Sequence, residues 1–142
     1  MATDLSRWTQ SKVCNMYFAK HETFHIRDGW LTKGLLTIQE QPRIFLDDEA
    51  PEELGLGKNM VRALRFWMQA TGLAEEIFED GQKIQKATKL GELIRDYDPY
   101  LETDGSLWLI HYNLVCSKEF ATSWYWFFNH YYFKNGTVCL LE

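Results

Sequence analysis

A glycine-containing turn between two helical patterns is the feature of this sequence that most narrows its fold. The acidic run before the turn, residues 47–54, predicts a short helix, because carboxylates stabilise the positive N-terminal end of a helix. Gly55-Leu56-Gly57 can adopt the positive φ angles that end a helix. After it, apolar residues recur at steps of three and four from Lys58 to Thr71, which predicts a long amphipathic helix.

A hairpin pattern follows that helix. Asp80-Gly81 lies between two strand-like runs, residues 73–78 and 82–88, and Asp-Gly is a typical two-residue hairpin turn. Upstream, helical spacing predicts another helix, capped by Asp28 and ending near Gln39. The order helix, short helix, turn, long helix, hairpin is that of the winged helix-turn-helix, whose second helix enters the DNA major groove. We therefore predict a mainly α winged helix-turn-helix fold with a small β-hairpin wing and extra C-terminal helices.

The remaining segments set the expected domain organisation. Residues 90–97 predict one or two helical turns, and residues 106–115 and 121–133 predict two further helices, the first capped by Asp104 or Ser106 and the second by Ser117 or Thr122. We expect an N-terminal arm or strand over residues 1–20, a winged helix-turn-helix core over residues 21–97, and a C-terminal helical extension over residues 98–142. The helix at 121–133 is apolar nearly all round, so we expect deep burial or a covering partner.

Composition limits the functions that such a chain can have. A length of 142 residues fits one domain, and a net charge of -5 with a pI near 5.4 argues against a uniformly basic nucleic-acid coat. The three cysteines, Cys14, Cys116 and Cys139, form no C-x-x-C pair and indicate a reducing cytoplasm. No uncharged run of about 18 residues is present that would span a membrane.

Local charge favours DNA as the partner. The polar face of the helix over residues 58–71 has no acid between residues 58 and 74, and the predicted wing adds lysines. Arginine binds guanine in a bidentate manner, Asn or Gln binds adenine, and lysine binds phosphates. The candidate contacts are Lys58, Asn59, Arg62, Arg65 and Gln69 on the helix, with Lys83 and Lys86 on the wing. The alternative is a solvated cationic face that balances the acids at 47–53, on a module that docks proteins.

His21-Glu22-Thr23-Phe24-His25 offers a different hypothesis, a zinc-dependent hydrolase. H-E-x-x-H on a helix places two imidazoles on one face to bind zinc, with the Glu as general base. Here the motif precedes the expected cap at Asp28, and no later motif supplies the third protein ligand that catalytic zinc needs. No nucleophile motif such as G-x-S-x-G is present either. We therefore expect no enzyme, no metal and no cofactor.

Several strings in one order resemble a bacterial family known only as a domain of unknown function, number four thousand and seven. They are His21-Glu22-Thr23-Phe24 with Arg27, Leu56-Gly57-Lys58-Asn59-Met60-Val61 with Trp67, Asp98-Pro99-Tyr100-Leu101-Glu102, Leu107-Trp108, His111-Tyr112 and Trp126-Phe127-Phe128-Asn129. The resemblance covers about residues 20–130, and its pattern does not include His25. It implies a longer protein with a further C-terminal region, and a place beside phosphoadenosine-phosphosulfate-reductase-type enzymes in DNA phosphorothioation and phage defence.

The sequence thus predicts a cytoplasmic DNA-binding accessory module of a DNA phosphorothioation or phage-defence system, with double-stranded DNA as partner and no membrane contact. The alternative is a protein-docking winged-helix module of a multi-protein modification or restriction complex. In that case the aromatic C-terminal helix meets a protein partner or the missing C-terminal region through Trp124, Phe127, Phe128 and Tyr131. A zinc-dependent hydrolase is the third and least favoured hypothesis.

Overall fold

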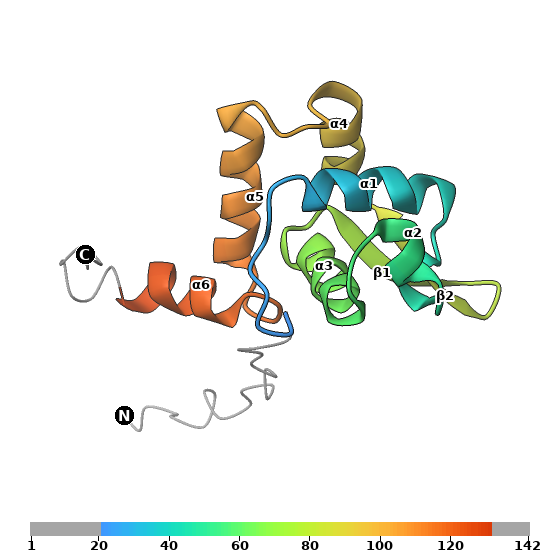
Figure 1. Cartoon of the computed structure of the whole chain (residues 1–142). Helices are drawn as coiled ribbons and strands as arrows, with labels where there is room; N and C mark the ends of the chain where they lie inside the picture. Colours follow the sequence, from blue (N-terminus) through green and yellow to red (C-terminus); the bar gives the residue numbers. More distant parts are fainter. Residues whose placement is uncertain (1–20, 132–142) are drawn as a thin grey trace, which may run out of the picture.

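The computed structural model describes residues 21–131, so the expected N-terminal arm over residues 1–20 lies outside the described residues. The described chain is a mainly α winged helix-turn-helix with a small hairpin, as the sequence predicts (Figure 1). Its core elements are α1(Trp30–Glu40), the 3-10 helix η2(Ile44–Leu46), α2(Ala50–Leu54), α3(Lys58–Ala70), β1(Ala74–Glu79) and β2(Gln82–Ala87). The C-terminal elements are α4(Lys89–Tyr97), α5(Asp104–Cys116), α6(Thr122–Trp126) and the π-helical turn η3(Phe127–Tyr131).

Helix α1 begins differently from the expectation. Its N-cap residue is Gly29 with φ 72°, which has no side chain to cap the helix, so the prediction that Asp28 is the cap is wrong. A left-handed residue turns the chain into the helix here, and glycine adopts that conformation without steric cost. Gly34 on the buried face lets α1 approach α3, because a Cβ at this position would lie 2.5 Å from the sulfur of Met68.

Helix α3 forms the centre of the core. Its apolar stripe is buried as predicted, and Leu64 and Met68 are completely inaccessible. The helix ends at Ala70, and Gly72 lies just beyond its C-cap residue Thr71. The φ of 72° at Gly72 allows the N–H of Leu73 to donate to the carbonyl of Met68 at 3.0 Å. This is the Schellman arrangement that closes many helices. The polar side of α3 therefore faces away from the core, next to the hairpin.

The hairpin has the register that its turn dictates. Asp80 and Gly81 have φ angles of 50° and 74°, which are typical of a type I′ turn, and the strands pair from Glu79↔Gln82 back to Ala74↔Ala87. Gln85 fastens the hairpin to the core, because its backbone N–H donates to the Pro42 carbonyl at 2.8 Å and its side-chain Nε2 donates to the Arg65 carbonyl at 3.2 Å. Gln85 thus attaches the wing to α3 and to the segment between α1 and η2.

Helix α5 packs on the core through one narrow edge. Ile110 and Leu114 join the hydrophobic core, and Asn113 Nδ2 donates to the Thr71 carbonyl at 2.9 Å. The helix starts after Thr103, so Asp104 and Ser106 are not its N-cap. In Figure 1, α6 runs from the foot of α5 away from the hairpin.

The last predicted helix is shorter and less regular than expected. The residue before α6 is Ala121, so neither Ser117 nor Thr122 is its cap. Within the predicted segment 121–133, the α-helix ends at Trp126 and a π-helical turn continues to Tyr131. Residues 132 and 133 lie outside the described part of the chain.

Candidate nucleic-acid interface

The polar face of α3 brings most of the predicted contacts together. Lys58, Arg62, Arg65 and Gln69 follow one another at steps of four, three and four residues, so they form one row along the helix. Asn59 lies at the edge of this row. Lys58, Asn59 and Arg62 are exposed, whereas Arg65 and Gln69 are partly covered. The helix therefore has an open N-terminal half and a C-terminal half that neighbours the wing.

The open half carries charges with few internal partners. The N-cap of α3 is Gly57, which has no side chain to cap the helix, and the first hydrogen bond runs from the Val61 N–H to the Gly57 carbonyl at 3.0 Å. Arg62 Nη1 lies 3.8 Å from Glu22 Oε1, and both side chains are about half exposed. Such surface pairs contribute at most about 1 kcal/mol. Arg62 is therefore able to exchange this carboxylate for a phosphate.

The covered half is organised around a carboxylate that the sequence analysis did not single out. Glu76 of β1 accepts from Arg65 Nε at 2.6 Å and from Gln69 Nε2 at 3.0 Å, and its other oxygen pairs with Lys83. Burial raises the pKa of Glu76, but the hydrogen bonds and charges of Arg65 and Lys83 outweigh it, so the pKa lies below its usual value. Glu76 is therefore a carboxylate anion that neutralises part of the cationic face.

The two predicted wing lysines point to opposite sides of the hairpin. Side chains alternate along a strand, and Lys83 and Lys86 are three residues apart on β2. Lys83 shares the α3 side with Glu76, whereas Lys86 is paired in register with Glu75 on the other side. There it lines a cleft with Pro42 and residues of α1 and α4. Lys83 thus adjoins the α3 row and Lys86 does not.

The hairpin is also less basic than its lysines alone indicate. Between residues 74 and 87 the acids Glu75, Glu76, Glu79 and Asp80 outnumber Lys83 and Lys86 by two. One further exposed residue was not anticipated: Phe78 is paired in register with Lys83 near the hairpin tip, and 77% of its surface is accessible. The Asp-Gly turn fixes this register, so the alternation of side chains counted from Gly81 reveals both Glu76 and Phe78.

The H-E-x-x-H motif does not have the helical geometry that a zinc site of this kind requires. Residues 21–23 form a turn in which Glu22 and Thr23 have φ angles of 51° and 65°, and helix α1 begins only at Trp30. The His21 ring instead stacks on Trp67 at 5.4 Å, and the Trp67 indole N–H donates to the Phe24 carbonyl at 2.8 Å. Within residues 21–131 no group of three His, Cys, Asp or Glu side chains lies close enough to hold a metal ion.

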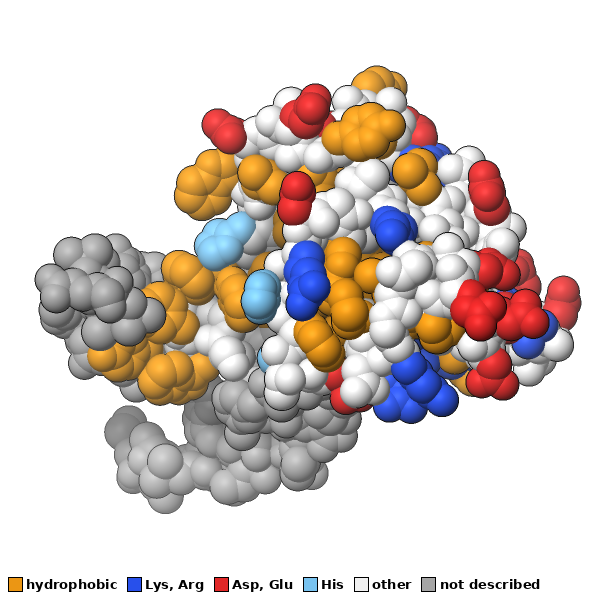
Figure 2. Space-filling view, viewed as in Figure 1, with side chains coloured by type: hydrophobic (Ala, Val, Ile, Leu, Met, Phe, Trp, Pro, Cys, Tyr) orange, Lys and Arg blue, Asp and Glu red, His pale blue; other side chains and the backbone are white. Residues whose placement is uncertain are grey.

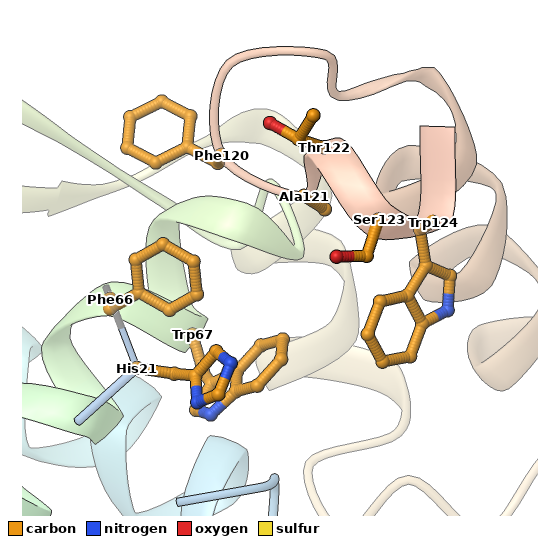
Figure 3. Close-up of a pocket in the computed structure, with 8 residues that line it drawn as sticks. All are labelled: His21, Phe66, Trp67, Phe120, Ala121, Thr122, Ser123 and Trp124. Atoms are coloured by element: carbon orange, nitrogen blue, oxygen red, sulfur yellow. The ribbon is translucent and has the colours of Figure 1, made fainter. Parts of the chain in front are cut away.

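An aromatic junction surrounds His21 and joins the motif to α3 and α6. Figure 3 shows its ring beside Trp67, with Phe66, Phe120 and Trp124 around the same space and the Ser123 hydroxyl directed into it. Within the described residues, His21 Nδ1 is buried without a hydrogen-bond partner. The cavity is only about 20 Å³, enough for a single water molecule but not for a substrate. The junction is therefore a packing feature.

A second surface, on α5 and α6, is apolar instead of charged. Figure 2 shows hydrophobic side chains gathered over these helices on the left, and acidic side chains on the right over α2 and the hairpin tip. We call the hydrophobic region on α5 and α6 the aromatic surface. Its large exposed residues are Leu107, Trp108, Leu109, Tyr112, Trp124 and Trp126. Of the residues predicted for docking, Trp124 is exposed, while Phe127, Phe128 and Tyr131 are half-buried. Trp108 and Tyr112, which are more accessible, were not anticipated.

The fold and the α3 row define a winged-helix protein with a candidate DNA-contacting face, and comparison with known proteins assigns its family. The chain belongs to the family described as protein of unknown function DUF4007, whose model matches residues 18–138. No curated protein matches the sequence. Within the described residues, no helix is long and apolar enough to cross a membrane.

Two solved structures of SspB are similar to the chain. One matches with a TM-score of 0.73 and 42% sequence identity, and covers 80% of this chain and 37% of that chain. The other is a magnesium-bound SspB with a TM-score of 0.72 and 42% identity, and covers 80% of this chain and 36% of that chain. The sequence thus spans little more than a third of the length of the SspB chains it resembles.

Proposed function

We propose that this protein is a DNA-binding accessory module of a DNA phosphorothioation or phage-defence system, and that it acts in the cytoplasm by binding, not by catalysis. The observation that carries the proposal is the row of exposed cationic and amide side chains on the second helix of a winged helix-turn-helix. Lys58, Asn59 and Arg62 are exposed at the N-terminal half of α3, the half that enters the major groove in helix-turn-helix proteins. Membership of DUF4007 and the likeness to SspB support the biological setting.

The charges set the expected character of the binding. Lys58 and Arg62 on α3 and Lys83 on the wing offer three side chains for phosphates, and the backbone N–H groups at the uncapped start of α3 add neutral donors. Each phosphate neutralised gives a slope of about −0.9 in log affinity against log salt, so three give roughly −3. With a net charge of -5 on the whole chain, we expect modest affinity that salt weakens readily.

Fluorescence anisotropy with random-sequence duplex at two salt concentrations tests the proposal. We expect Arg62→Ala to weaken binding about fivefold and to reduce the salt slope by about one, because one phosphate contact is lost. Lys118→Ala is the matched control, since Lys118 is an exposed lysine in the connection between α5 and α6. Equal affinities for the wild type and the Arg62 variant contradict the proposal.

Phosphorothioate-containing duplex of the same sequence tests the biological setting separately. The wild type is titrated against matched duplexes with and without the modification in the same salt. A difference in affinity shows that the protein senses the modification. Equal affinities leave DNA binding intact but limit the protein to a role that does not distinguish modified from unmodified DNA.

The aromatic surface favours a second candidate function, docking to a protein of the same system. Trp108 and Tyr112 expose 70% and 64% of their area, which is unusual for such large side chains on a monomer. A shallow cleft of about 360 Å³ lies between Trp108, Leu107, His111 and Asp104. Docking alone predicts no duplex affinity at moderate salt and a stable complex that is lost in Trp108→Gln.

A further inference from the structure

Glu76 binds three polar side chains from two elements, and this contact divides the cationic face into side chains with free donors and side chains without them. Gln69 has no donor left: its Nε2 donates both to Glu76 Oε1 at 3.0 Å and to the Arg65 carbonyl at 3.3 Å. Adenine recognition by glutamine needs a free amide N–H together with the amide oxygen. Gln69 is therefore not available to bind adenine in the way that the sequence suggests.

Arg65 is held in the opposite way, with one nitrogen bound and two free. Its Nε donates to Glu76 at 2.6 Å, and its Nη1 and Nη2 make no hydrogen bond to any of residues 21–131. The side chain is 26% exposed, so part of it is in contact with solvent. The guanidinium is rigid and planar, so fixing Nε also fixes the direction of the terminal pair. That pair forms a fork that can bind two adjacent acceptors.

The neighbouring charges indicate that this fork is suited to a base and less suited to phosphate. Glu76 has only 13% of its side chain exposed and lies against both Arg65 and Lys83, so its negative charge offsets their attraction for phosphates. A carboxylate beside an arginine also lowers the entropy lost when the arginine binds, because the side chain is already ordered. The arrangement therefore favours geometric selectivity over electrostatic affinity.

We propose that Arg65 recognises a guanine in the DNA major groove through Nη1 and Nη2, with Glu76 as the residue that positions it. Guanine presents two adjacent acceptors there, O6 and N7, which match the arginine fork. The inference rests on the proposed function, because it requires α3 to lie in the major groove. It adds guanine as the ligand of Arg65. It also gives a role to Glu76, whose negative charge would oppose a direct contact between this site and a phosphate.

Selection of bound sequences from a random duplex library provides the first test. We expect the wild type to enrich sites with one fixed guanine, and Arg65→Ala and Glu76→Gln to lose that preference. Arg65→Lys gives an independent check that does not alter Glu76, because lysine keeps the positive charge but lacks the fork. The matched control is Arg62→Ala, which we expect to bind more weakly but to keep the preference for guanine.

The second test replaces the selected guanine by 7-deazaguanine, which lacks the N7 acceptor. We expect the wild type to lose about tenfold in affinity, at the lower end of the range for a bidentate base contact, because one of its two hydrogen bonds is lost. Glu76→Gln is expected to lose less than twofold on the same replacement. It is also expected to bind unmodified random duplex more tightly and with a steeper salt slope, because the negative charge of Glu76 no longer offsets the attraction of Arg65 and Lys83 for phosphates. If Glu76 has only a structural role, the wild type and Glu76→Gln lose the same factor of affinity when guanine N7 is removed.

The outcomes separate this inference from the function on which it rests. A wild type that binds no duplex removes the proposed function and the guanine contact together. A wild type that binds duplex without a guanine preference, or whose preference survives in Arg65→Ala and Arg65→Lys, removes only the guanine contact. Loss of the preference in Arg65→Lys and Glu76→Gln, with its retention in Arg62→Ala, supports the inference.

Discussion

Helix α3 and helix α5 have the same length but solve the problem of burial in different ways. In α3 the apolar residues form one stripe that the core covers, so its remaining face is polar, open at the N-terminal half and partly covered by the wing at the other half. In α5 apolar residues occur on all sides, and the core covers only Ile110 and Leu114. Helix α3 therefore buries its apolar side chains and exposes charged ones, whereas α5 leaves apolar side chains exposed. This difference is the physical reason why we propose different partners for the two surfaces, DNA for α3 and protein for α5.

Trp67 tests whether these two helices belong to one cooperative unit, and its removal should have the largest effect. Its ring contacts His21, Phe66 and Trp124, and its indole N–H donates to the Phe24 carbonyl, so it joins α3 to α6. We expect Trp67→Ala to lower the free energy of unfolding by about 3–5 kcal/mol, as for other large-to-small core changes. Urea denaturation followed by circular dichroism measures the loss.

Trp67→Phe is the control, because it keeps a ring in the junction and removes the indole N–H. We expect a smaller loss of stability than for Trp67→Ala, with one transition in both variants. Two separate transitions in either variant would show that α5 and α6 fold independently of the winged-helix part. In that case the aromatic surface is a property of a separate unit, and the comparison between α3 and α5 loses its basis.

Much of the winged-helix part was predictable from the sequence because its signals are local. The stripe of α3, the Gly55 turn and the Asp80-Gly81 hairpin each follow from short-range patterns, and all three are present. The errors lie where a local signal competes with a backbone requirement. Asp28 resembles a cap, but the left-handed φ of Gly29 starts the helix, and the 3-10 helix at Ile44 has no period long enough to be detected.

The candidate site was harder to predict because its key contacts are between elements. The lysines of β2 were counted without the acids of β1, although the hairpin register places Glu76 diagonally opposite Lys83. The link from Glu76 to Arg65 depends on how the hairpin packs against α3, which no spacing in the sequence encodes. Helical spacing was enough to place these residues together on the polar face of α3, but the division into free and bound donors needed three-dimensional contacts.

Trp108 sharpens the comparison from the side of α5. Its ring is mostly exposed, and its one ring contact with residues 21–131 is with His111 at 5.9 Å. We therefore expect Trp108→Gln to change the free energy of unfolding by less than about 0.5 kcal/mol. Duplex affinity should remain that of the wild type. Thermal unfolding and anisotropy measure the two quantities. A loss of DNA binding in this variant contradicts the proposal that α3 binds DNA and α5 binds a protein.

Asp98 lies in the segment before α5, and its substitution should have the smallest effect on stability. The hydroxyls of Ser106 and Thr103, with the backbone N–H groups of Glu102 and Thr103, lower the pKa of Asp98 to about 2. Its carboxylate accepts from the Glu102 N–H at 2.9 Å and the Thr103 N–H at 3.1 Å. Because the folded pKa lies below the usual value of 3.8, the stabilisation is present above about pH 4 and is lost as pH falls towards 2.

Replacement of Asp98 by asparagine tests this polar attachment of α5. We expect Asp98→Asn to lower stability slightly at neutral pH and to flatten the dependence of stability on pH between about 4 and 2, because the group that titrates there is gone. The matched control is Asp96→Asn, which removes an exposed carboxylate that pairs with Arg95 and leaves the Asp98 contacts unchanged. An equal flattening in both variants would assign the effect to general surface charge. Flattening in Asp98→Asn alone means that polar contacts at its N-terminal end help to place α5, whereas burial of a continuous apolar stripe places α3.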